Sequence, residues 1–308
     1  MLMLLALAVP LAVLGFAVDG GSDDDETTDQ IGTEADDRFE GETGDDFIDG
    51  QAGDDIMNGR AGDDTIFGRE GEDVLQGQDG DDMLCSGEGD DVVTGNTGHD
   101  LIEGQGGDDF VSGDYGFDTV RGDEGNDTVL GGRGGDVVEG NDGDDVIFGG
   151  IIEGVPLNLE ELTALRDGGS LEDINGGIEM RDDSLGNTLR GGTGDDDIII
   201  GSGDWVGGGV GDDTFHIMSE QTELREGETE TRIIDYNGDD DAITVIVDDT
   251  AADADINVVI DGEDAIVQMG DTVLARVEGA GASLTAADIT LVAQNTAQSL
   301  FDPNPATA

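Results

Sequence analysis

The sequence contains no lysine. Its 11 basic residues, all arginine, stand against 76 acidic ones, for a formal net charge of −65 over 308 residues. Without lysine there is neither a phosphate-loop lysine nor a Schiff-base lysine. So acidic a chain repels a phosphate backbone, and we therefore predict no nucleic-acid partner. The charge alone is typical of a disordered chain, but the acids recur at a fixed period between apolar residues, which indicates folding that depends on a cation.

Cysteine and histidine are also scarce. Cys85 is the only cysteine, so there is no disulfide framework and no multi-thiolate metal site, and we interpret Cys85 as a surface thiol. The two histidines, His99 and His216, do not belong to a His-Glu-x-x-His zinc motif. A Gly-x-Ser-x-Gly nucleophile elbow is absent as well. These absences predict a protein that is not an enzyme.

What the chain does contain is a nine-residue repeat, present in thirteen tandem copies over residues 32–148. Position one is Gly in twelve copies, with Ser86 as the exception, and position four is Gly in twelve, with Ala35 as the exception. Position six is always Asp and position eight is always apolar. Glycines at positions one and four permit a turn, and the apolar residue at position eight marks a short strand.

These short strands predict a solenoid, because three residues cannot form a sheet alone and must stack on neighbouring copies. Two turns and two strands close a coil of eighteen residues, so each copy lies above the copy two further along, about 4.8 Å away. The position-six carboxylates then form columns. The carboxylates in such a column repel one another unless a cation lies between them, and oxygen-rich turns suit a hard ion such as calcium.

The candidate calcium ligands are the position-six aspartates of the thirteen copies and of two later ones. They are Asp37, Asp46, Asp55, Asp64, Asp73, Asp82, Asp91, Asp100, Asp109, Asp118, Asp127, Asp136 and Asp145, followed by Asp196 and Asp213. Eleven pairs of copies lie one coil apart in the main block, so we expect about eleven calcium ions or more.

The repeat resembles the Gly-Gly-x-Gly-x-Asp-x-U-x signature of the repeats-in-toxin (RTX) proteins. The resemblance implies a parallel β-roll, in which calcium is held by the position-six aspartate and by turn carbonyls of adjacent coils. It also implies export by type I secretion. One departure stands out: position two is Gly only at Gly87 and Gly132. Backbone carbonyls remain available as ligands there.

The chain begins with an apolar stretch, residues 1–18, long enough to span roughly 27 Å as a helix. We interpret it as a signal sequence or an anchor, and as the only segment that would contact a membrane. Residues 19–31 are acidic and predict a flexible linker. The protein is therefore expected to be secreted or attached to the cell surface.

After residue 148 the period breaks, and residues 149–181 read as an insertion with a short helix. Asn158 would cap this helix with Glu161, and Gly168 would end it. The repeats resume over residues 182–216, where one copy is a residue short, so the register of Asp204 is uncertain. We interpret Trp205, the only tryptophan, as a packing residue.

Residues 217–295 contain longer alternating stretches joined by Asp/Gly turns, which predict antiparallel strands. A solenoid needs a cap on its open end, and we assign that role to this region, followed by a tail at 296–308. The predicted fold class is therefore all-β: a parallel β-roll solenoid of nonapeptide calcium-binding repeats, capped by a C-terminal antiparallel β region.

These features favour a secreted calcium-binding protein with a structural or interaction role. A secreted enzyme with a site on the C-terminal strands, and a passive calcium buffer, remain alternatives. Position seven is apolar in nine of the thirteen copies although it should point outward, which favours self-association or a cell-surface partner through the outer strand faces. The alternative interpretation is that β-branched residues simply suit strands and that the helical insertion covers some of them.

Overall fold

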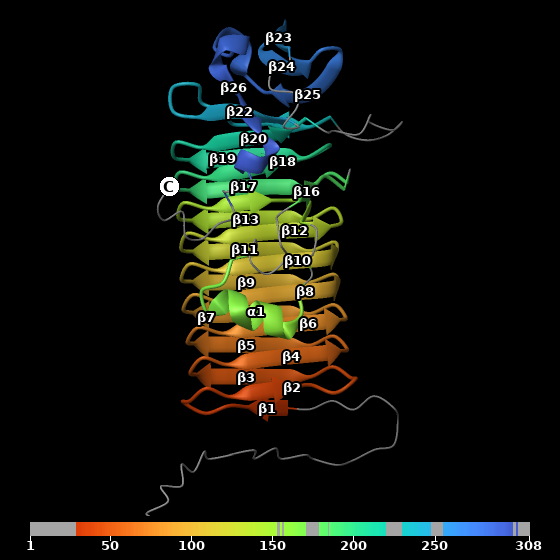
Figure 1. Cartoon of the computed structure of the whole chain (residues 1–308), viewed down its shortest axis with the longest axis vertical. Coiled ribbons are helices and arrows are strands. Elements are labelled where there is room, and N and C mark those ends of the chain that lie inside the picture. Colours follow the sequence, from red (N-terminus) through yellow and green to blue (C-terminus); the bar gives the residue numbers. More distant parts are fainter. Residues whose placement is uncertain are drawn as a thin grey trace, which may run out of the picture.

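The computed structural model describes residues 29–152, 155, 157–170, 179–183, 185–219, 230–247, 255–297 and 300. They form a column of stacked strands built from two sheets (Figure 1). Sheet A contains, in spatial order, β1 (Asp29–Ile31), β3 (Phe47–Ala52), β5 (Thr65–Glu70), β7 (Met83–Glu88), β9 (Leu101–Gly106), β11 (Thr119–Glu124), β13 (Val137–Asp142), β17 (Thr188–Thr193), β19 (Trp205–Val210), β21 (Arg232–Ile233), β25 (Thr272–Val277), β24 (Asp264–Met269) and β23 (Ile256–Asp261). Sheet B contains β2 (Arg38–Glu40), β4 (Ile56–Ala61), β6 (Val74–Asp79), β8 (Val92–Gly98), β10 (Phe110–Gly116), β12 (Thr128–Arg133), β14 (Val146–Phe148), β18 (Asp197–Ile200), β20 (Thr214–Met218), β22 (Ala242–Val247) and β26 (Ile289–Ala293).

The coil of eighteen residues is confirmed by the strand register. In sheet A, β3 pairs with β5 in parallel and Ile48 lies beside Ile66; in sheet B, β4 pairs with β6 and Met57 lies beside Leu75. The position-eight side chains of both sheets meet in one core, where these four residues are completely buried. A one-residue slip would turn every core side chain to the outside, so the core holds the register.

The turns explain the glycine at position four of the repeat and show how position two does without one. A Cβ added to Gly71, at position four, would lie 2.1 Å from the carbonyl oxygen of Gly53 in the coil below, so no side chain fits there. Position two lies in the left-handed region in eleven copies, and nine of these residues are not glycine, for example Gln78 at φ 90°. The departure from Gly at position two is therefore accommodated by backbone strain.

The insertion leaves the roll after β14 and packs on the outer face of sheet B. It contains β15 (Ile151–Ile152), α1 (Leu159–Arg166) and β16 (Met180–Arg181). Helix α1 begins at the predicted N-cap Asn158, whose capping box with Glu161 is present. It lies across β6 and β8 (Figure 1), where Leu157 and Leu162 are buried in the same cluster as Val74, at position seven.

The outer face of sheet B is therefore not an exposed apolar patch. Val74, Val92 and Phe110, all at position seven, are at most 8% exposed, because the insertion covers this cluster. Two further expectations are wrong. Cys85 is 4% exposed, and its burial raises the pKa of the thiol to about 11. Trp205 is 49% exposed rather than packed.

The C-terminal region continues the roll before it caps it. Strands β22 and β26 extend sheet B in parallel, and β21 and β25 extend sheet A, so that among the described residues of this region only β23, β24 and β25 pair antiparallel. The region also contains the short helices η1 (Ala280–Ala282), η2 (Ala286–Asp288) and α3 (Gln294–Ala297). The predicted fold class is confirmed, with the antiparallel pairing confined to a smaller part of residues 217–295.

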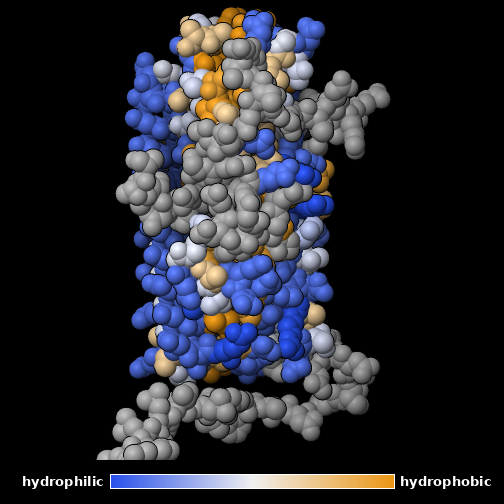
Figure 2. Space-filling view, in the orientation of Figure 1, coloured by the Kyte–Doolittle hydropathy of each residue, from blue (hydrophilic) through white to orange (hydrophobic). Residues whose placement is uncertain are grey.

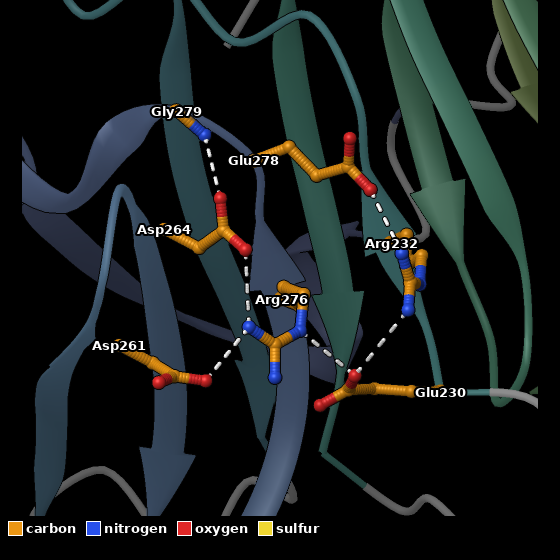
Figure 3. Close-up of polar contacts among 7 residues, drawn as sticks. All are labelled: Glu230, Arg232, Asp261, Asp264, Arg276, Glu278 and Gly279. Atoms are coloured by element: carbon orange, nitrogen blue, oxygen red, sulfur yellow. Dashed lines mark hydrogen bonds and ion pairs between the residues drawn. The ribbon is translucent and has the colours of Figure 1, made fainter.

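An ion-pair network ties the antiparallel strands to the end of the roll. The guanidinium of Arg276 on β25 contacts Glu230, Asp261 and Asp264, and Arg232 on β21 contacts Glu278 (Figure 3). The flanks of the molecule are hydrophilic, and apolar surface is visible towards the cap (Figure 2). The ion pairs thus link the antiparallel strands of the cap to β21 and to the segment before it, at the end of the roll.

The ends of the chain fall partly outside the described residues. The apolar residues 1–18 lie outside them, as do most of the linker and most of the tail. Asp29–Ile31, which we assigned to the linker, forms β1 and pairs with β3, because its backbone completes the first coil of sheet A. Within the part of the chain that the structure describes, no helix is long and apolar enough to cross a membrane.

Candidate metal centre

The position-six aspartates form two columns, one along each sheet. In both, the backbone N–H of one aspartate donates to Oδ1 of the aspartate one coil further on, over 2.7 to 3.2 Å. Column A, beside sheet A, contains Asp46, Asp64, Asp82, Asp100, Asp118 and Asp136. Column B, beside sheet B, contains Asp37, Asp55, Asp73, Asp91, Asp109, Asp127, Asp145, Asp196 and Asp213. The structure thus brings all fifteen predicted residues into line.

The second carboxylate oxygen of most column members has no partner in the protein. Oδ2 is buried and accepts no hydrogen bond in Asp55, Asp64, Asp73, Asp82, Asp91, Asp100, Asp109, Asp118, Asp127, Asp136, Asp145 and Asp196. A buried carboxylate oxygen without a partner is costly, and proteins almost always supply one. Twelve such oxygens at the same position of the repeat indicate that a partner of positive charge belongs there.

Eleven of the twelve unpartnered oxygens face the position-one glycine of their own copy, and in the copy that contains Asp91 this position is Ser86. A Cβ added to Gly50 would lie 2.3 Å from Oδ2 of Asp55 and 2.9 Å from the carbonyl oxygen of Gly68, one coil further on. A side chain at position one would therefore fill the space between a carboxylate and a main-chain carbonyl. This explains why position one is glycine in most copies. It also means that a carboxylate oxygen and a carbonyl oxygen, both ligands that calcium prefers, border the same small space.

Burial perturbs the acidity of the columns. Desolvation raises the pKa of Asp64 and Asp73 to about 6, of Asp82 and Asp91 to about 8, and of Asp109 to about 9. Neighbouring carboxylates add to the effect, and the hydrogen bond from the backbone N–H of the preceding aspartate in the column opposes it. The buried column aspartates therefore bind protons more readily than exposed aspartates do.

The first member of each column differs from the rest. Oδ2 of Asp37 accepts hydrogen bonds from the backbone N–H and the hydroxyl of Thr33, both over 2.8 Å. Oδ2 of Asp46 accepts the N–H of Glu42 over 2.6 Å. At its other end, column B continues beyond the repeats, because the N–H of Asp213 donates to Oδ1 of Asp241 over 3.3 Å.

A second, exposed ladder escaped the sequence analysis. At position five, the carboxylate of one copy accepts the backbone N–H of the copy one coil further on, as from Asp63 to Asp45 over 2.9 Å and from Asp108 to Asp90 over 2.9 Å. These bonds run in the opposite direction to those of the columns. Asp is frequent at position five in the sequence, and that frequency could have predicted the ladder. These bonds link the turns of successive coils.

Side chains alone do not complete a metal site. Among the residues that the structure describes, no three His, Cys, Asp or Glu side chains lie close enough together to hold one ion. The residues nonetheless fit calcium, because each slot offers a partnerless carboxylate oxygen next to main-chain carbonyls, and calcium prefers six to eight oxygen ligands of this mixed kind.

Comparison with protein-family models identifies the repeat. The RTX calcium-binding nonapeptide repeat matches in four copies, at residues 31–66, 59–93, 86–120 and 121–151. Residues 31–151 of the chain therefore consist of RTX calcium-binding nonapeptide repeats. The matched RTX segments contain every predicted ligand except Asp196 and Asp213, which the columns place in the same register.

Two further comparisons add little to this RTX assignment. Among solved structures, the crystal structure of the extracellular lipase LipA from Serratia marcescens matches with a TM-score of 0.22 and 13% sequence identity, covering 89% of this chain and 41% of the lipase chain. This chain thus spans about two fifths of the length of the lipase. No curated protein matches the sequence.

Proposed function

We propose that this chain is a secreted or cell-surface calcium-binding protein whose repeats fold when calcium binds. The observation that carries the proposal is the set of twelve buried Oδ2 atoms without a partner. The position-six aspartates of columns A and B would hold the ions together with main-chain carbonyls of the turns. Calcium, when bound, supplies the positive charge that these oxygens lack.

Folding would depend on calcium because, without it, neighbouring carboxylates in each column repel one another. Two unit charges 5 Å apart repel by about 0.8 kcal/mol even at the dielectric constant of water. Column A has five neighbouring pairs and column B has eight. The summed repulsion is about 10 kcal/mol, which is comparable with the whole stability of a domain.

This dependence suits an exported protein. At micromolar or lower calcium inside a cell the chain would remain unfolded, and at roughly millimolar calcium outside it would fold. The repeat family supports secretion of the type I kind. We propose that residues 1–18 either direct export or anchor the protein outside the cell, and that a cleaved or intact native N-terminus, measured by mass spectrometry, distinguishes these roles.

The role that we propose outside the cell is structural or interactive rather than catalytic. Because the insertion covers the position-seven cluster of Val74, Val92 and Phe110 on sheet B, we place self-association or a cell-surface partner on the outer face of sheet A, where Met83 is 37% exposed. Sedimentation of the calcium-loaded protein, with cell-envelope binding, tests this part. A Met83→Asp variant should weaken any association, with Met57→Leu in the core as the control.

A calcium titration followed by far-ultraviolet circular dichroism tests the main proposal. We expect a cooperative gain of β signal with calcium and none with magnesium, which demands tighter octahedral geometry and gives up its water reluctantly. The ions should number about eleven or more. A roll that stays fully folded in a calcium chelator at pH 8 would contradict the proposal.

A further inference from the structure

Column A ends in an unusual way where the chain returns from the insertion. Asn187 and Asp204 continue its line: the N–H of Asp136 donates to Oδ1 of Asn187, and the N–H of Asn187 donates to Oδ1 of Asp204, both over 2.8 Å. The strands that follow them agree, because Thr188 of β17 lies between Val137 of β13 and Trp205 of β19. Both residues therefore occupy position six of their coils.

An amide nitrogen of Asn187 stands where the other column members carry the partnerless oxygen. A Cβ added to Gly131 would lie 2.8 Å from Oδ2 of Asp136, and a Cβ added to Gly149 would lie 2.5 Å from Nδ2 of Asn187. This nitrogen donates to Oδ1 of Asp204 over 3.1 Å. A hydrogen-bond donor thus faces the place where, elsewhere in the column, an oxygen faces a slot.

Asp204 is equally different from the other buried carboxylates. It is 1% exposed, yet both of its oxygens accept hydrogen bonds: Oδ1 from the N–H and the amide of Asn187, and Oδ2 from the N–H of Gly201 over 2.7 Å. It is absent from the set of aspartates with a partnerless Oδ2. Protein donors satisfy Asp204 in the way that a cation would satisfy its counterparts.

On the opposite side of the same coil, column B keeps its usual chemistry. Asp196 accepts the N–H of Asp145 at Oδ1, over 3.0 Å, and its Oδ2 is buried without a partner. The contrast is therefore local to one column, and the burial of the coil as a whole does not explain it. It follows the replacement of an aspartate by an asparagine.

We propose that Asn187 and Asp204 form a calcium-free closure of column A, so that calcium in this column is confined to the coils from Asp46 to Asp136. The inference rests on the proposed calcium function. Its physical basis is that an amide N–H donor repels a cation and that a carboxylate with both oxygens already paired gains little from one. The coil that contains Asn187 then binds calcium on one side only.

Counting calcium ions in variants of the full chain tests the closure. Bound calcium per chain is measured at saturating calcium by equilibrium dialysis with elemental analysis, and folding by circular dichroism. Asp204→Asn should bind as many ions as the wild type but melt at a lower temperature, because its new amide faces the N–H of Gly201. Asn187→Asp should bind one additional ion, because it restores the repeat.

Two control variants separate this inference from the proposed function. Asp100→Asn, in the middle of column A, should lose at least one ion, and Asp195→Asn, at an exposed position five, should lose none. Loss of an ion in Asp204→Asn, or an unchanged count in Asn187→Asp, would overturn the closure. A folded Asp100→Asn with an unchanged count would instead overturn the proposed calcium site.

If a closure variant fails to fold, the wild-type protein still decides. Anomalous scattering from crystals of the calcium-loaded full chain places each ion directly. We expect peaks in column A up to Asp136 and in column B beside Asp196. A peak between Asn187 and Asp204 would overturn the closure.

Discussion

Acid should replace calcium in folding the roll. The perturbation is removal of calcium by a chelator, followed by a pH titration from 9 down to 5. Desolvation raises the pKa of the twelve column aspartates with a partnerless Oδ2 from 3.8 to values between about 6 and about 9. The folded roll therefore binds more protons than the unfolded chain across this range, and its stability without calcium increases as the pH falls.

The sign and the size both follow from the raised pKa values. Stability is fully present below the unfolded pKa of about 4 and is lost as pH rises through the folded values of about 6 to 9. Each pKa unit corresponds to about 1.4 kcal/mol, so ionising one aspartate whose folded pKa is about 7, such as Asp118, costs the folded state on the order of 4 kcal/mol. Three such aspartates match the 5–15 kcal/mol by which a domain is usually stable.

Circular dichroism and the fluorescence of Trp205 provide the assay, at low protein concentration because the sequence pI is 4.1. Without calcium, the β signal should be absent at pH 8 and should appear as pH falls towards 5. With saturating calcium it should be present throughout. Calcium binding at pH 8 should also release protons. A chelated protein that is folded at pH 8 and unfolds in acid would refute the reasoning.

Three smaller predictions use single positions of the roll and its cap. Replacing Asp91 and Asp109, neighbours in column B, by Asn should shift the calcium midpoint upward by about tenfold or more, while Asp90→Asn at position five should not; an equal shift in Asp90→Asn would contradict this. Gln78→Gly should raise the free energy of unfolding in calcium by about 0.5–1 kcal/mol, seen as a higher urea midpoint, because glycine adopts the left-handed φ of 90° without the strain of a side chain. Arg276→Leu should destabilise the cap by about 1–3 kcal/mol in thermal melts and leave the calcium midpoint unchanged, since its ion pairs lie outside both columns.

The repeat predicted most of the roll because one nonapeptide contains its whole geometry. Apolar residues such as Ile66 at every position eight required a shared core, and the period of nine required a coil of eighteen. From these two facts the columns follow without any knowledge of the hydrogen bonds within them. The sequence could not predict that one carboxylate oxygen would accept a hydrogen bond while the other would have no partner. The two oxygens of an aspartate such as Asp55 are equivalent in a sequence and differ only in what they face in the fold.

The outer faces could not be predicted, since strand alternation says which way a side chain points but not what lies above it. Val92 and Met83 both occupy position seven, yet Val92 is 4% exposed beneath the insertion and Met83 is 37% exposed on the other sheet. The place where the insertion packs on the roll depends on contacts between distant segments, such as the hydrogen bond from Gln76 to the carbonyl of Leu157, 81 residues further along the chain. No local pattern records such a contact.

The position of the insertion explains why it leaves the columns intact. Residues bonded along a column are normally 18 apart, but Asp136 and Asn187 are 51 apart, as are Asp145 and Asp196. The additional chain thus lies between two column positions of each sheet, in a turn, where closing a longer loop costs little free energy. The one-residue deletion that follows is also taken up in a turn, since both columns then shorten to an interval of 17. A change of length within a strand would shift the core side chains out of register, so the chain changes length only in turns, where the next position-six residue can rejoin its column. When column A resumes after the insertion, its first position-six residue is Asn187 in place of an aspartate.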